Sequence, residues 1–142
     1  MEIDRNGLEV LARDECFRLL EKATLGRIAF SRGALPTVVP VNFCLQDERV
    51  LIRTGPGSKL DAALEDQVVA FEVDDFDATY HSGWSVLVTG RAQAITTPTE
   101  LDALALAPVT SWAPAGGGTV ISVSTELVSG RRLRQVSLAH SA

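Results

Sequence analysis

The sequence predicts a mainly β fold of the α+β class, an antiparallel barrel with two or three helices. Short segments rich in β-branched residues follow one another with turn signals between them, and the regular βαβ alternation of a parallel sheet is missing. The longest of these segments contains internal glycines, which supply the strong bends that a small closed barrel needs. The chain has 142 residues, of which 46% are hydrophobic, so residues 1–142 are expected to form a single domain with a substantial core.

Seven segments have strand character, and β-branched or alternating apolar residues dominate most of them. They are residues 27–31, 36–45, 50–52, 67–74, 82–96, 119–127 and 131–138. Residues 46–49 predict a hairpin turn, and Ser129 with Gly130 predict a turn before the last strand. Gly83 and Gly90 in the longest strand predict a bulge, a bend, or close approach by a ligand or another backbone. Residues 1–12 show no clear pattern.

Three separate stretches predict helices. The first, residues 14–23, carries an apolar stripe at helical spacing, and Asp14 is its candidate cap. The second is expected to begin after Ser58 and to end near residue 65. The third begins at a capping box that starts with Thr97, and it is expected to run to about residue 107.

Composition excludes several classes of function. The net charge is -5 and the pI is about 5.0, which argues against general affinity for nucleic acid or for anionic membranes. No apolar run approaches the roughly 20 residues of a membrane span, and the N-terminus has no signal-peptide core, so a cytoplasmic protein is expected. Cys16 and Cys44 are then expected to be reduced thiols. Neither these cysteines nor the scattered histidines have metal-site spacing, and no residue pattern indicates a catalytic group.

Residues 53–60 combine cations, hydroxyls and glycines in a way that suits an anion. Arg53 and Thr54 end a short apolar strand, and Gly57, Ser58 and Lys59 follow within five residues. An arginine fork, a lysine and the N–H groups of a helix start can together bind a phosphate. The alternative is a polar connection between a strand and a helix with two surface cations.

Pro40 lies in the middle of a predicted strand. Because proline cannot donate to a β ladder, it predicts an edge, a bulge or a break. Asn42 offers an amide that can donate and accept hydrogen bonds to a ligand, although it can equally be an exposed residue beside an edge-strand proline. Trp112 lies in a Gly/Pro/Ala loop and can be a lid, an interface anchor or ordinary core cover.

Several short motifs, taken together and in order, resemble one known family. They are LGRIAF at 25–30, VPVNF at 39–43, RT at 53–54, GSKL at 57–60, VAFEVD at 69–74, GWSVLVTGRA at 83–92 and GRR at 130–132. This order is similar to that of the pyridoxamine 5'-phosphate oxidase-like family of flavin-binding split β-barrels. The resemblance extends from about residue 10 to about residue 134.

The resemblance implies a split barrel and a homodimer that binds flavin mononucleotide (FMN) at the dimer interface. By position, Arg53, Thr54, Ser58 and Lys59 correspond to the phosphate grip, and Leu60 belongs to the same cofactor-binding motif. The resemblance also implies that the backbone at Pro40 and Val41 and the amide of Asn42 contact the isoalloxazine ring. Trp84 and Ser85 are implied to make further contacts with the cofactor, and Trp112 is implied to cover the ring from the partner subunit.

The resemblance leaves the substrate open. The oxidase itself is longer and has substrate-phosphate residues near its C-terminus, for which this chain has no counterpart, so pyridoxamine 5'-phosphate is not expected to be the substrate. Relatives with this fold reduce nitro compounds, quinones or biliverdin. Some use the deazaflavin F420 and some bind haem, so an F420-dependent reductase and a non-enzymatic flavin- or haem-binding protein are the alternatives. A haem ligand would have to be a residue such as His81.

Overall fold

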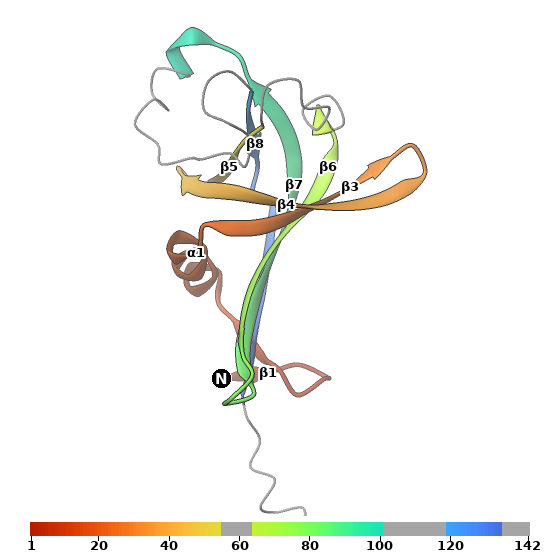
Figure 1. The fold of residues 1–142 in the computed structure, drawn as a ribbon. Helices are drawn as coiled ribbons and strands as arrows, with labels where there is room; N and C mark the ends of the chain where they lie inside the picture. Colours follow the sequence, from red (N-terminus) through yellow and green to blue (C-terminus); the bar gives the residue numbers. More distant parts are fainter. Residues whose placement is uncertain (55–63, 101–118, 135–142) are drawn as a thin grey trace, which may run out of the picture.

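The computed structural model describes residues 1–54, 64–100 and 119–134 (Figure 1). Within them lie one helix, α1 (Arg13–Lys22), and nine strands. The strands are β1 (Glu2–Ile3), β2 (Glu9–Leu11), β3 (Leu25–Arg32), β4 (Leu35–Gln46), β5 (Arg49–Arg53), β6 (Val68–Asp77), β7 (Ser82–Ile95), β8 (Val120–Val123) and β9 (Leu127–Leu133).

Six strands close into an antiparallel barrel, which confirms the predicted fold class. The order around the ring is β7–β6–β3–β4–β5–β8, and β8 pairs back onto β7. Strand β9 pairs with the other half of β7, and the N-terminal strands β2 and β1 continue the sheet beyond it. Strands β6 and β7 form the long vertical hairpin in Figure 1, while β3 and β4 cross it nearly at right angles.

Strand β7 belongs to two sheets, and Gly90 lies where it changes partner. Up to Thr89 the strand pairs with β9, and from Ala92 onward it pairs with β8. At the crossing, the Ser124 N–H donates to the Arg91 carbonyl at 3.1 Å, and a Cβ on Gly90 would overlap the Ser124 carbonyl group. The predicted close approach of another backbone to this glycine is therefore confirmed.

The core fills the barrel and continues beneath α1. Its largest fully buried side chains include Phe71, Ile28 and Leu20, and Phe43 meets Phe71 edge-on with ring centroids 4.8 Å apart. Helix α1 contributes Cys16, Phe17 and Leu20 from one side, as its apolar stripe predicts. These residues attach the helix to the barrel.

Three local expectations were wrong. Asp14 does not cap α1: the N-cap is Ala12, without a side-chain hydrogen bond, and the Asp14 carboxylate pairs with Arg18 at 3.3 Å inside the first turns. Gly130, expected in a turn with Ser129, lies within β9, where a Cβ would fall 2.6 Å from the Cys16 sulfur; glycine serves close packing there. The chain turns earlier, between β8 and β9, and residues 1–12 form the short strands β1 and β2.

The other expected strands and the hairpin at residues 46–49 are confirmed, with ends shifted by a few residues. Asp47 and Glu48 make this turn with φ of 51° and 57°. Most of the second and third predicted helices, and residues 135–138 of the last predicted strand, lie outside the described residues.

The first prediction tests the close contact between the backbone of β7 at Gly90 and the chain at Ser124. Gly90→Ala should lower the free energy of unfolding by about 1–3 kcal/mol, because the added methyl group forces β7 away from the chain at Ser124. Chemical denaturation measures the change. Thr89→Ala, one residue away on the outward face, is the matched control and should change stability by about 0.5 kcal/mol or less. Equal stabilities of the two variants would contradict this account of the crossing.

Candidate functional site

Strand β4 presents a free edge to the outside of the barrel. From Pro36 to Asn42 it pairs with β3 alone, and β5 joins on its other side only at Phe43. Among the described residues, Pro40 therefore lies in an edge strand, which confirms one of the positions that its missing N–H predicted. Side chains alternate along this edge, so Pro40 is exposed while Val41 points inward and is only 5% exposed.

Asn42 and Arg53 lie next to each other on the outward face. The β4–β5 ladder ends with Phe43 paired with Ile52, and continuing its register by one residue places Asn42 opposite Arg53. Within the described part of the chain, neither the Asn42 amide nor the Arg53 guanidinium has a hydrogen-bond or ion-pair partner. A hydrogen-bonding amide beside a free cation is what the edge of a flat polar ring and an attached phosphate require.

Thr54, the residue after Arg53, is buried, and both its hydroxyl and its backbone N–H form hydrogen bonds with Thr119. Its hydroxyl donates to the Thr119 carbonyl at 3.2 Å and accepts from the Thr119 N–H at 3.2 Å, and its own N–H donates to the same carbonyl at 2.8 Å. The one donor hydrogen of this hydroxyl is thus used. In this arrangement Thr54 holds the end of β5 against residue 119 and so fixes the position of Arg53.

Four of the candidate cofactor-binding residues lie outside the described residues: Ser58, Lys59, Leu60 and Trp112. Their roles stay predictions. The described chain resumes at Leu64, which is fully buried in the core. On the other side of these residues the described chain stops at Thr54, next to the exposed Arg53.

Trp84 and Ser85 do not lie beside Asn42 within one copy of the chain. Ser85 shares the outward face with Asn42, in a row that runs from Asn42 through Leu25 and Asp74 to Ser85. The row crosses three strand spacings, which is about 14 Å. Trp84 points to the opposite face, where it packs against the core.

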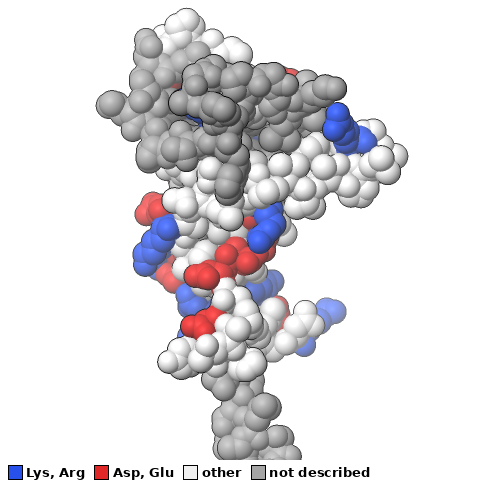
Figure 2. Space-filling view, viewed as in Figure 1, with Lys and Arg blue, Asp and Glu red and all other residues white. Residues whose placement is uncertain are grey.

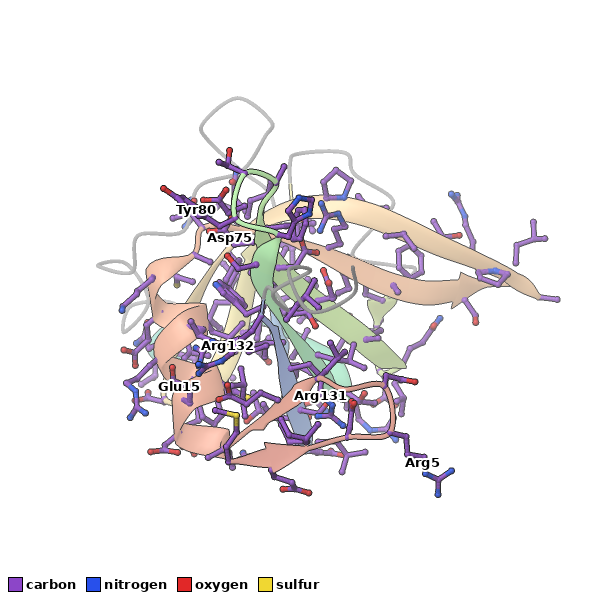
Figure 3. The ribbon with its side chains drawn as sticks, turned by 90° about the horizontal axis from the view of Figure 1, so that it is seen from below. Arg5, Glu15, Asp75, Tyr80, Arg131 and Arg132 are labelled. Atoms are coloured by element: carbon purple, nitrogen blue, oxygen red, sulfur yellow. The ribbon has the colours of Figure 1, made fainter. Side chains whose placement is uncertain are left out.

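On that opposite face, Trp84 and Asp75 line a hollow of about 350 Å³ between the end of α1 and the β6–β7 hairpin. Figure 3 shows Asp75 and Tyr80 at this hairpin, away from the N-terminal strands. The hollow also reaches Leu25 and Asp74, and Leu25 pairs with Asn42, so the hollow adjoins the Asn42 edge.

A charged cluster that the sequence did not indicate lies in the middle of the outward face. One guanidinium nitrogen of Arg27 on β3 is 3.3 Å from Glu72 and 2.9 Å from Asp74, both on β6. Burial, together with the hydrogen bond and charge of Asp74, raises the pKa of Glu72 to about 7, and the charge and hydrogen bond of Arg27 oppose this rise. The only sign of this cluster in the sequence is that Glu72 and Asp74 occupy alternate positions of a predicted strand, so that both carboxylates lie on the same face.

The two arginines of the closing GRR motif point to opposite faces (Figure 3). Arg132 contacts Glu15 of α1 at 3.1 Å and Glu9 at 3.5 Å, while Arg131 pairs with Asp4 at 2.8 Å. Hydrogen bonds from Arg18 and Arg132 lower the pKa of Glu15. Both arginines therefore attach the N-terminal elements to β9 and leave no free cation for a ligand on this strand.

The described residues contain no group of three or more potential metal ligands, and no helix among them is long and apolar enough to cross a membrane. Cys16 and Cys44 are free thiols, and burial raises the pKa of each. The raised pKa values keep these thiols protonated and unreactive near neutral pH.

Residues 12–132 match the pyridoxamine 5'-phosphate oxidase family. The chain belongs to this family. It is 38% identical over 128 residues to the uncharacterized protein Rv0080 of Mycobacterium tuberculosis, and the match covers 87% of this chain and 84% of that protein. The family assignment is consistent with both the ordered motifs and the closed barrel.

Two solved structures of flavoproteins resemble this family member. The FAD-binding protein of Mycobacterium smegmatis is 32% identical, with a TM-score of 0.76, over 89% of this chain and 98% of that one. An FAD-binding protein of Mesorhizobium loti is 21% identical, with a TM-score of 0.70, over 90% and 98% of the two chains. The second likeness shows the shared split-barrel fold alone.

The Thr54 contacts generate the second prediction. Thr54→Val keeps the shape but removes the hydroxyl, which leaves backbone groups of residue 119 without their side-chain partner. We expect the free energy of unfolding to fall by about 1–3 kcal/mol in chemical denaturation. Thr54→Ser, which keeps the hydroxyl, is the matched control and should retain most of the stability. If Thr54→Ser lost as much as Thr54→Val, the lost methyl and not the hydroxyl would be responsible.

Proposed function

We propose that this chain is a flavin-dependent oxidoreductase that acts as a homodimer, with FMN or the FMN unit of FAD at the subunit interface. The observation that carries the proposal is the pair formed by the Asn42 amide and the Arg53 guanidinium at the edge of β4, neither of which has a partner among the described residues. The FAD-binding protein of Mycobacterium smegmatis, 32% identical over most of both chains, supports the choice of a flavin.

The residues at this edge fit such a cofactor. A flavin needs an apolar surface for its ring, hydrogen bonds at its polar edge and fixed positive charge at its phosphate. The exposed Pro40 offers apolar surface, the backbone at Val41 and the Asn42 amide offer hydrogen bonds, and Arg53 offers the charge. We assign Ser58 and Lys59 to the same phosphate because they follow Arg53 closely in the sequence.

The bound flavin would supply hydride and electron transfer, and the protein would bind it, orient it and limit its contact with water. The substrate stays open. The free thiols fit the reducing conditions of the cytoplasm, where we place the protein.

A second copy of the chain is needed to complete this site. Within one copy, Ser85 is about 14 Å across the outward face from Asn42. In a two-fold dimer, the same surfaces of both copies meet, so Ser85 of a second copy can approach the ring that Asn42 of the first copy binds. We extend this proposal to Trp112, but not to Trp84, which packs against the core on the opposite face of its own copy.

The first test is the absorbance spectrum of the purified protein before and after addition of FMN, FAD or F420, in one titration series. Flavin bands near roughly 375 and 450 nm that shift on binding support the proposal. Tighter binding of F420 would favour the deazaflavin alternative. A Soret band that His81→Ala abolishes would favour haem. A protein that binds none of them would contradict the cofactor assignment.

Oxidoreductase activity needs its own measurement. After anaerobic photoreduction of the bound flavin, addition of a quinone or a nitroaromatic compound should reoxidise it much faster with the protein than with free flavin. A rate no faster than that of free flavin for both acceptors would leave the chain as a flavin carrier or store.

The phosphate grip generates the third prediction. Arg53→Ala and Lys59→Ala should each weaken FMN binding by about 1.5–3 kcal/mol, roughly 10- to 150-fold, because each removes a charge-assisted contact. Riboflavin, which lacks the phosphate, should bind all variants almost equally. Arg32→Ala removes an exposed arginine at the end of β3 and is the charge-matched control. Unchanged FMN affinity in both variants would show that the phosphate lies elsewhere.

A further inference from the structure

The backbone of β4 directs its hydrogen-bonding groups alternately toward β3 and away from it. The Phe43 N–H donates to the Thr24 carbonyl at 3.0 Å, so Phe43 turns its N–H to the β3 side. Because the β3–β4 pairing runs without a bulge along the whole of β3, the odd-numbered residues of β4 all bond to that side. The even-numbered residues therefore turn their N–H and carbonyl groups to the free edge, at positions 36, 38, 40 and 42.

Proline occupies every second one of these outward-directed positions. Pro36 and Pro40 have no N–H, so only Val38 and Asn42 keep a backbone donor on this edge. These two donors are separated by about 13 Å of strand, whereas an antiparallel partner strand needs a donor about every 7 Å. The two prolines thus remove half of the donors that a neighbouring strand would use, and they leave the bonds between β4 and β3 intact.

Without these prolines, the edge would suit a strand of another chain well. From Pro36 to Asn42, β4 pairs on one side only within the described chain. The strand is 12 residues long and contains no Asp, Glu, Lys or Arg, and Val38 is 62% exposed. The β3–β4 hairpin projects to the right of the barrel in Figure 1, and Figure 2 shows mostly uncharged surface over it. A long, uncharged edge rich in β-branched residues is a template for pairing with other chains.

The other end of the same sheet is protected in a different way. Strand β1, which lies at that end, is only two residues long and includes Glu2. Short edge strands and charged side chains both prevent pairing with another chain. Because β4 is neither short nor charged, its two prolines are the protection that its sequence provides.

We propose that Pro36 and Pro40 close the free edge of β4 to strands of other chains and so keep it open to a small ligand. A strand needs a continuous row of backbone donors and acceptors, whereas a small molecule needs only one or two polar contacts. A charged side chain would also deter a strand, but it would place a hydrated group beside Asn42, where proline adds apolar surface. This role goes beyond the proposed flavin site, because it holds for any ligand of this edge.

The fourth prediction concerns the full-length protein without added flavin, studied by sedimentation velocity over a dilution series. The double variant Pro36→Thr/Pro40→Thr restores both N–H groups with a residue that favours strands. Its weight-average mass should rise with concentration and exceed that of the wild type at least about twofold at the highest concentration. Pro98→Thr makes the same exchange at an exposed proline outside the sheet, so it is the matched control and should sediment as the wild type does.

A third substitution tests whether the restored N–H groups cause the association. Val38→Pro, added to the double variant, returns a proline to an outward-directed position and costs no bond to β3, so the assemblies should shrink toward the wild-type mass. Circular dichroism and thermal unfolding establish that each variant is folded. If the double variant does not fold, the single variant Pro36→Thr, close to the hairpin tip, replaces it and should show a smaller rise in mass.

Two outcomes would overturn the closure of the edge. One is a folded double variant that sediments as the wild type does at every concentration. The other is assembly that persists unchanged after Val38→Pro, because the exchanged side chains and not the N–H groups would then be responsible.

Repeating the series with FMN separates this inference from the proposed function. The single variant Pro36→Thr keeps Pro40, and a flavin bound at this edge should oppose its assembly. If saturating FMN leaves the assembly unchanged, the closure of the edge stands and the flavin lies elsewhere.

Discussion

The closure of the barrel through β7 is the constraint on which the rest of the structure depends. One strand of 14 residues pairs with β9 in its first half and with β8 in its second. This is possible because Gly90 lets the chain at Ser124 approach the backbone of β7 without a side chain between them. The change of partner closes the ring and leaves β9 free to bind the N-terminal strands and to pack against α1.

The same geometry separates two faces with different properties. Inward-facing residues of every barrel strand form the core, and α1 covers its open end with Cys16, Phe17 and Leu20. The ion pairs of Arg132 with Glu9 and Glu15 reinforce this contact, although their partial exposure keeps each contribution small. The outward face carries the candidate site and, next to it, a second buried cluster formed by Leu51, Ile95 and Val120.

The candidate site depends on where strands end. Strand β4 extends beyond β5 up to Asn42, so its edge keeps backbone groups and one amide available. Strand β5 ends at Arg53, and the contacts of Thr54 hold that end in place. A ligand that meets this edge lies on the same face as Arg27 and Glu72.

The sequence by itself determined the class of fold and the strand segments, and it limited Gly90 and Pro40 to a few structural roles each, among them the close approach and the edge position that the structure shows. These features depend on local properties: β-branched residues, side-chain alternation, and the missing Cβ or N–H of a single residue. The family assignment also came from ordered local motifs, which the match over residues 12–132 supports.

Only the tertiary structure decided which distant residues share a face. It placed Arg53 beside Asn42, put Trp84 and Ser85 on opposite faces, and brought Arg27 to Glu72. Each of these relations depends on the register between strands far apart in the sequence, and a shift of one residue would reverse every side chain. No local pattern specifies that register, because it is set by how the whole barrel closes.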